Sequence, residues 1–213
     1  MRPTLPATAS LAAKAPRIDV LINNAGAIFE RREVTADGLE KTFAVNHMAY
    51  FVITEILRPG LAADGRIVST ASGAHAFGVL DFDDLQSTRG YSGIGAYGRS
   101  KLCNILWTRE LAHRLEGSGV TANCVHPGGV RTGFGENNRG LTKTLFGLVR
   151  PLLLSPEKGA DTLVYLAAAP EVAGRTGGYW SRRRLTQPTV AARDPAAARR
   201  LWEVSARLAA LPA

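Results

Sequence analysis

Short apolar runs alternate along this chain with longer segments in which apolar residues recur every three or four positions. Three such runs, at 18–22, 66–72 and 120–126, have the length and β-branched content of buried strands. Each ends in small or turn-forming residues. A fourth, shorter strand is expected at 177–180. The runs therefore predict several strands separated by other elements.

Helical periodicity fills the intervals between these strands. The predicted helices, each bounded by a capping residue, a proline or a glycine, span about 37–58, 97–116, 156–169 and 195–211. We assign no element to the first seventeen residues. Strands that alternate with helices imply right-handed crossovers and a parallel sheet covered on both faces. The expected fold is an α/β, Rossmann-like three-layer sandwich.

Composition is compatible with one domain over 1–213, and 46% of its residues are hydrophobic. No apolar run approaches the roughly 18 residues that a membrane span requires. The first residues also lack the apolar stretch of a secretory signal, so a cytoplasmic protein is expected. Cys103 and Cys124 have no metal-ligand spacing, and we expect both to be buried apolar residues.

The formal net charge is +8, which raises the question of a nucleic-acid partner. Apart from runs such as Arg182–Arg184, however, the basic residues are scattered among acidic ones, and no aromatic residues alternate with them. We therefore expect no nucleic-acid partner. The four histidines show no metal-binding spacing, so no metal site is expected.

Unusual residues gather where the predicted strands end: Asn24–Gly26 after the first, Ser72 after the second and Pro127–Thr132 after the third. In parallel sheets, ligands bind at the carboxyl ends of the strands. On the following helix, Tyr97 and Lys101 are four residues apart and share one face. A cation in that position stabilises a phenolate and lowers its pKa. Each motif alone also has a plain structural interpretation, as a tight turn, a strand end or a chance spacing.

Taken together, the motifs resemble the short-chain dehydrogenase/reductase family, and within it the retinol dehydrogenase-like branch. The segments that carry the resemblance are Asn23–Gly26, Val45–His47, Arg66–Ser72, Tyr97–Leu106, His126–Thr132 and Arg200–Ser205. They occur in the family's order and at its spacings, over about residues 17 to 211.

The resemblance implies an oxidoreductase that interconverts an alcohol and its carbonyl with NAD or NADP, NADP being favoured. It implies that Tyr97 is the general acid in reduction and the base in oxidation, and that Ser72 donates a hydrogen bond to the substrate oxygen. Lys101 would lower the pKa of Tyr97 and hold the nicotinamide ribose. Asn46 would join a proton relay by binding a water molecule behind Lys101.

The resemblance also implies a cofactor-binding set. Beside Tyr97 and Lys101, this set consists of Asn24, Ala25, Gly26, Pro127, Gly128, Val130 and Thr132. Small residues at 24–26 would let the backbone approach the cofactor, with Gly26 free to take a positive φ. Val130 would meet the carboxamide, and Thr132 the carboxamide or the pyrophosphate. His126 is expected only to pack.

Residues 133–154 are rich in apolar side chains and correspond to the family's mobile lid over the substrate. This composition indicates a lipophilic alcohol or carbonyl as substrate, although ordinary helix packing explains it equally well. The sequence leaves open a homo-oligomer. A sugar-nucleotide epimerase shares the Tyr-x-x-x-Lys pair, but the Trp202 region fits the retinol dehydrogenase-like branch better.

The front of the chain departs from the family pattern. A dinucleotide site needs a glycine-rich turn between its first strand and helix, and the seventeen residues before Ile18 contain no glycine. The strand at 18–22 would then be an apolar sheet edge, which favours aggregation. We expect either a truncated product with N-terminal strands missing or a start placed too late. The alternative function is that of an inactive remnant with a binding or assembly role.

Overall fold

A computed structural model describes residues 4–131 and 153–210. These residues form one sheet with the strand order β1-β2-β3-β4-β5. The strands are β1 (Ile18–Asn23), β2 (Leu61–Thr70), β3 (Thr121–Val125), β4 (Tyr179–Ser181) and β5 (Arg184–Thr186). The first four are parallel, and β5 returns antiparallel to β4. The parallel sheet expected from the sequence is therefore confirmed, with one antiparallel strand added at its edge.

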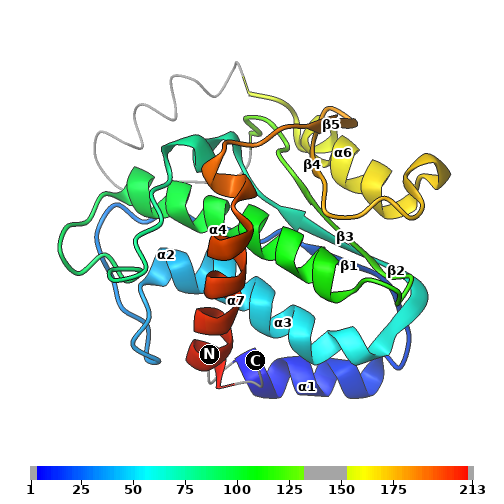
Figure 1. Cartoon of the computed structure of the whole chain (residues 1–213), viewed down its shortest axis with the longest axis horizontal. Helices are drawn as coiled ribbons and strands as arrows, with labels where there is room; N and C mark the ends of the chain where they lie inside the picture. The colour runs from blue at the N-terminus through cyan, green and yellow to red at the C-terminus, as the bar shows by residue number, and fades with distance from the viewer. Residues whose placement is uncertain (1–3, 132–152, 211–213) are drawn as a thin grey trace.

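Helices lie on both faces of this sheet, and α3, α4 and α6 contact its strands. The helices of the described residues are α1 (Thr4–Lys14), α2 (Lys41–Phe43), α3 (Ala49–Leu57), α4 (Gly93–Arg114), α6 (Pro156–Ala168) and α7 (Pro195–Ala209). A π turn, η1 (Ala44–Met48), joins α2 to α3, and short 3₁₀ turns include η3 (Gly73–Phe77). The helix α4 runs across the middle of the molecule between α3 and α7, and α1 lies alongside α3 (Figure 1).

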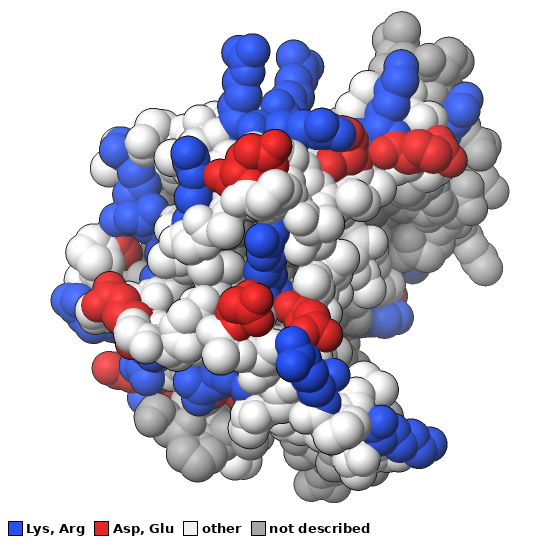
Figure 2. Space-filling view, turned by 90° about the vertical axis from the view of Figure 1, so that its right-hand side faces the viewer, with Lys and Arg blue, Asp and Glu red and all other residues white. Residues whose placement is uncertain are grey.

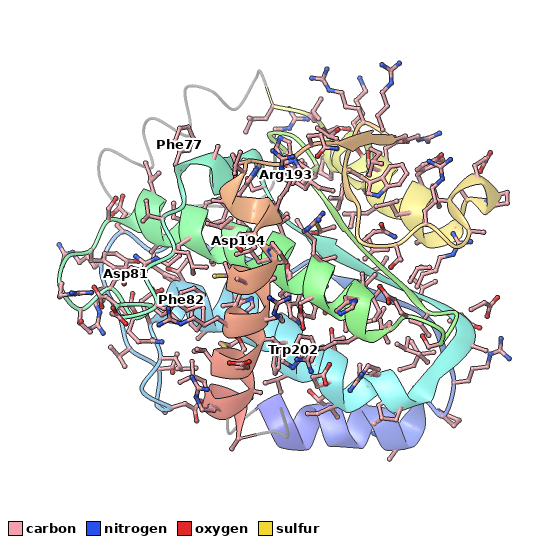
Figure 3. The ribbon with its side chains drawn as sticks, viewed as in Figure 1. Phe77, Asp81, Phe82, Arg193, Asp194 and Trp202 are labelled. Atoms are coloured by element: carbon pink, nitrogen blue, oxygen red, sulfur yellow. The ribbon has the colours of Figure 1, made fainter. Side chains whose placement is uncertain are left out.

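Two hydrophobic clusters, one on each face of the sheet, hold the layers together. Successive residues of a strand point to opposite faces, so Ile67 and Val68 of β2 enter different clusters. Ile67 packs into the cluster formed with α3, α4 and α7, where Trp202 points from α7 toward α3 and α4 (Figure 3). Val68 packs with Leu163 and Leu166 of α6. This arrangement confirms the three-layer sandwich.

The predicted helix over 37–58 is interrupted and starts later than expected. Glu40, not Asp37, caps its first turn, because the Glu40 carboxylate accepts hydrogen bonds from the backbone N–H groups of Thr42 and Phe43 at 2.7 and 2.8 Å. The π turn η1 then breaks the regular pattern. Sequence periodicity did not reveal this break, because one extra residue in a helix hardly disturbs the spacing of apolar positions.

Other boundaries shift, and two elements were not predicted. β2 begins at Leu61, earlier than expected, because Leu61 pairs with Ile18 of β1. The strand ends at Thr70, so Ser72 lies just beyond it. The helix α1 and the short strand β5 were both missed. A segment of three residues gives too little pattern to be recognised.

β1 is an edge of the sheet, as the sequence predicted. Within the described part of the chain its one strand neighbour is β2. Val20 and Ile22, two residues apart on one face of β1, are 37% and 44% exposed. The edge therefore presents both unpaired backbone groups and apolar side chains.

Charged side chains of both signs are mixed on the surface. On the face shown in Figure 2, acidic residues lie between the basic ones, and several basic side chains project from the upper rim. Cys103 and Cys124 are buried and free, as predicted, and burial raises the pKa of both thiols to about 12. Within the ranges that the structure describes, no helix is long and apolar enough to cross a membrane, and no cluster of metal-ligating side chains occurs.

Candidate active site

Tyr97 and Lys101 lie in the N-terminal half of α4, whose first turn is capped by Ser92. The Lys101 ammonium is 5.7 Å from the centroid of the Tyr97 ring and 5.6 Å from that of Tyr50. Lys101 is only 2% exposed, and this burial lowers its pKa to about 7. The lysine therefore changes charge in the neutral range instead of remaining a permanent cation.

The ends of β1 and β2 enclose the Lys101 ammonium. Its Nζ donates a hydrogen bond to the backbone carbonyl of Thr70, the last residue of β2, at 3.0 Å. On the other side lies Gly26, where a β-carbon would be 3.3 Å from both Lys101 Nζ and Asn46 Oδ1. Gly26 does not use the positive φ that a glycine permits, because it is not among the glycines with a left-handed backbone. Its role here is to leave space beside the ammonium.

Ser72 reaches Tyr97 from the segment that follows β2. It is the N-cap of η3, and its Oγ accepts from the Ala74 backbone N–H at 3.2 Å. A hydrogen bond also links the Ser72 and Tyr97 side chains and favours the phenolate, but burial outweighs it and raises the pKa of Tyr97. Burial therefore decides the direction of the Tyr97 pKa here, and the predicted lowering by Lys101 stays a prediction.

Two histidines hold the Ser72 segment in place. His126 Nδ1 accepts a hydrogen bond from the Gly73 backbone N–H at 3.1 Å. His75 Nε2 accepts from the Thr189 N–H at 3.2 Å, so its Nδ1 carries the proton that it donates to the Ser72 carbonyl at 2.7 Å. His126 was expected only to pack; instead it links the end of β3 to the segment that carries Ser72.

Asn46 lies in the π turn and is fully buried. Its Oδ1 accepts from the Ala27 N–H at 2.8 Å, and its Nδ2 donates to the Ala27 carbonyl and to Ser100 Oγ, both at 2.9 Å. The side chain thus clamps the turn after β1 to α4. Its predicted part in a water-mediated proton relay stays a prediction.

The turn Asn24–Gly26 is exposed, and hydrogen bonds hold its first two residues. Asn24 Oδ1 accepts from the Thr70 hydroxyl at 2.9 Å, and the Tyr50 hydroxyl donates to the Ala25 carbonyl at 2.8 Å. Such a turn offers a pre-formed backbone surface next to the Lys101 ammonium. The predicted contact of residues 24–26 with a cofactor stays a prediction.

The segment after β3 turns at Gly128 and pairs with the segment that precedes α6. Gly128, which follows Pro127, has a φ of +87°, and backbone hydrogen bonds of 2.8 Å join Arg131 and Gly129 to Leu154. The side chain of Val130 packs against Gly159 of α6. Its predicted contact with a carboxamide stays a prediction. Thr132 and most of the predicted lid, up to residue 152, lie outside the described residues.

Sequence reasoning missed several polar residues around the site, namely Tyr50, Thr70 and Asn104. A usable signal was present, because Lys101, Asn104 and Thr108 are spaced by three and four residues. They fall on a buried face of α4 among apolar side chains. Polar residues repeated along a buried helical face indicate an internal hydrogen-bond network.

The nicotinamide half of a dinucleotide fits these residues. Lys101 and Tyr97 carry the ammonium and hydroxyl donors that ribose hydroxyls would require, and no side chain at Gly26 stands between its backbone and the ammonium. The pyrophosphate half is different, because it needs a glycine-rich turn at a helix N-terminus. The helix before β1, α1, contains no glycine. The fit therefore concerns the nicotinamide end, and residues 24–26, 97 and 101 would hold it.

Comparisons with known proteins agree with this geometry. The model of the "short chain dehydrogenase" family matches residues 5–141. Retinol dehydrogenase 14 of Homo sapiens is 45% identical over 195 residues, which cover 89% of this chain and 58% of that protein. Retinol dehydrogenase 13 of Homo sapiens is 44% identical over 205 residues, covering 92% of this chain and 62% of that protein.

A solved structure shares the fold and carries a cofactor. The short chain dehydrogenase from Burkholderia cenocepacia, in complex with NADP, superposes with a TM-score of 0.62 at 25% identity and covers 84% of this chain and 69% of that one. The present chain spans about three fifths of the length of the two retinol dehydrogenases. With its α/β fold, its Ser72, Tyr97 and Lys101 in one place and its family match, this chain belongs to the short-chain dehydrogenase/reductase family, in the retinol dehydrogenase-like branch.

Proposed function

We propose that this protein is an NAD(P)-dependent oxidoreductase that interconverts a lipophilic alcohol and its carbonyl. The observation that carries the proposal is the meeting of Ser72, Tyr97 and Lys101 at the carboxyl end of β2. Ser72 is hydrogen-bonded to Tyr97, and Lys101 is buried one helical turn further along α4. Carbonyl reduction requires these two functions of a protein: a proton donor and stabilisation of the developing alkoxide.

Different residues of this chain would bind the substrate oxygen and transfer its proton. Bound NADPH or NADH would supply the hydride. Ser72 and Tyr97 would bind the substrate oxygen, and Tyr97 would give it a proton in the direction of reduction. The raised pKa of Tyr97 supports this role, since the hydroxyl keeps its proton at neutral pH. In alcohol oxidation the same group must lose its proton, and a charged Lys101 would favour the phenolate.

Exposed apolar side chains near Tyr97 support a lipophilic substrate. Phe77, Val79 and Ile94 are 73%, 74% and 65% exposed. Phe77 and Val79 flank Gly78, which touches the backbone of Gly98 next to Tyr97. Phe77 lies beside the first turns of α4 (Figure 3). Two relatives are named as retinol dehydrogenases, and retinol is a lipophilic alcohol.

Tyr97→Phe tests the proposal, because it removes the hydroxyl and keeps the ring. Turnover of retinol, retinal and simpler ketones is measured with NADPH and with NADH. Tyr97→Phe should abolish turnover while the cofactor affinity stays within about tenfold. Tyr91→Phe is the matched control, since its hydroxyl bonds to Phe29 and Thr42 instead. Turnover retained by Tyr97→Phe would overturn the assignment.

An assembly or binding role is the second candidate, and the exposed edge strand β1 favours it. The affinity of the pure, folded chain for NADPH and NADH separates the two candidates. Saturable binding at micromolar concentrations supports the oxidoreductase. Absence of binding to either cofactor supports the assembly role.

A further inference from the structure

A buried chain of polar side chains runs from α7 to the carbonyl that holds Lys101. Ser205 of α7 lies with its Oγ 2.9 Å from His47 Nε2, and His47 Nδ1 is 3.4 Å from Asn104 Oδ1. Asn104 Nδ2 donates to the Thr70 carbonyl at 3.2 Å. Ser205, His47 and Asn104 are fully buried. An unpaired polar group in such a place is costly, so the arrangement of these bonds is tightly constrained.

The direction of every hydrogen bond in this polar network follows from the two backbone carbonyls at its Asn104 end. Asn104 Nδ2 faces the carbonyls of Thr70 and Asn46, which can only accept. Asn104 Oδ1 therefore faces His47 and must accept, so the proton of His47 is on Nδ1. His47 Nε2 then accepts from the Ser205 hydroxyl. Burial lowers the pKa of His47 to about 4, which keeps the ring neutral and in one tautomer.

Asn104 shares an acceptor with Lys101. The two side chains lie one turn apart on α4, and both donate to the Thr70 carbonyl, Lys101 at 3.0 Å and Asn104 at 3.2 Å. The second hydrogen of the Asn104 amide fixes the Asn46 carbonyl at 3.0 Å. The side chain of Asn46 in turn lies beside the same space as the ammonium, next to Gly26. The Asn104 amide thus fixes both the Thr70 carbonyl, which accepts from Lys101, and the Asn46 carbonyl.

We propose that Asn104 is a positioning residue for Lys101, and that His47 and Ser205 hold its amide in the orientation that presents both hydrogens to the carbonyls of Thr70 and Asn46. The inference deepens the proposed function and rests on it, because it gives Lys101 its place in the reaction. The hydrogen bonds themselves can be measured whether or not the chain turns over a substrate. The rings of Tyr50 and Tyr97 are the titratable neighbours that also face the ammonium.

Nuclear magnetic resonance can test this directly, because the chain contains four histidines and five lysines. In the unmodified protein labelled with ¹⁵N-histidine, His47 should show the proton on Nδ1 and remain neutral down to pH 5. In protein labelled with ¹³C,¹⁵N-lysine, one side chain should titrate near neutral pH, well below the usual lysine range. A proton on Nε2 of His47 in this protein would overturn the inference without any variant.

Asn104→Leu keeps approximately the shape of the side chain and removes its amide. His47 Nδ1 then has no acceptor, whereas the Ser205 oxygen can accept from Nε2, so the ring should switch to the Nε2–H tautomer. The Thr70 carbonyl becomes free to interact with Lys101 alone, and the titration midpoint of Lys101 should rise by at least about half a pH unit. Turnover should fall about tenfold or more, because the Thr70 and Asn46 carbonyls around the ammonium are no longer fixed by the amide.

Thr108→Val is the matched control. Thr108 is buried on the same helix, and its hydroxyl donates to the backbone carbonyl of Asn104 at 2.7 Å, away from the amide. This variant should keep the Nδ1–H tautomer and the Lys101 titration of the unmodified protein. Unchanged signals in Asn104→Leu, or equal changes in Thr108→Val, would contradict the positioning role. Loss of turnover by every form, with the predicted signals present, would reject only the proposed function.

Discussion

Gly98 of α4 lies so close to Ala74 of η3 that a β-carbon at position 98 would be 2.8 Å from the Ala74 carbonyl oxygen. The next nearest atoms also belong to backbone, at Gly78. Backbone cannot give way as the end of a flexible side chain can. The absence of a side chain at position 98 therefore lets the segment that starts with Ser72 pack directly on α4.

Gly98→Ala should consequently impair both stability and turnover. Alanine in a helix is normally more favourable than glycine by up to about 1 kcal/mol. Here the contact with Ala74 should reverse the sign and destabilise the protein by about 1–3 kcal/mol, as overpacking does. Displacement of Ser72 from Tyr97 should lower kcat/KM about tenfold or more. Urea unfolding and steady-state kinetics measure the two effects.

Gly95→Ala provides the control for that experiment. Gly95 lies in the same helix, where a β-carbon would be in ordinary contact with Ser92, at 3.5 Å. This substitution should leave the free energy of unfolding unchanged or raise it slightly. If Gly98→Ala behaves like Gly95→Ala, the close approach does not position Ser72.

His47 should make the protein less stable in acid. Its folded-state pKa of about 4 is below the ordinary value of 6.5 because the ring is buried. Between these two values the unfolded chain binds a proton that the folded chain does not, so stability falls as the pH decreases. From pH 7 to pH 4.5 this group alone should reduce the free energy of unfolding by about 2 kcal/mol.

Chemical denaturation at several pH values checks this contribution. His47→Gln should flatten the pH dependence, whatever its stability at pH 7. Part of the slope should remain, because the pKa of His126 is also lowered by burial. His113→Gln should not flatten it, since His113 is exposed and its pKa is raised by Glu116. An equally steep slope in His47→Gln would show that the buried ring is not responsible.

The edge strand β1 should promote self-association. Val20 and Ile22 project from one face of an unpaired edge, and lysine at such positions is a common natural protection. The double substitution Val20→Lys and Ile22→Lys should reduce concentration-dependent association, measured by sedimentation velocity. Val190→Lys, at an exposed position outside the sheet, should have no such effect. A monodisperse unmodified protein would refute the prediction.

Much of the fold could be predicted from the sequence, because the relevant signals are local. Short apolar runs mark the positions of β1, β2 and β3, although β1 is less buried than its run predicts. Ser155 and Asp194 cap α6 and α7 as their residue types indicate. The edge position of β1 was also predicted correctly. The break at the π turn and the start of the helix after Glu40 were not predicted, because they depend on contacts made with other segments.

For the site too, local sequence signals predicted some features, and contacts between distant segments decided the others. The sequence by itself determined which side chains could carry the chemistry, since the spacing of Tyr97 and Lys101 and the residues at the strand ends are properties of the linear chain. Only the tertiary structure decided their electrostatics and support. Burial, which depends on every packed neighbour, raises the pKa of Tyr97 and lowers that of Lys101. Likewise, Ser205 and Asn104 meet His47 only because three distant segments fold together.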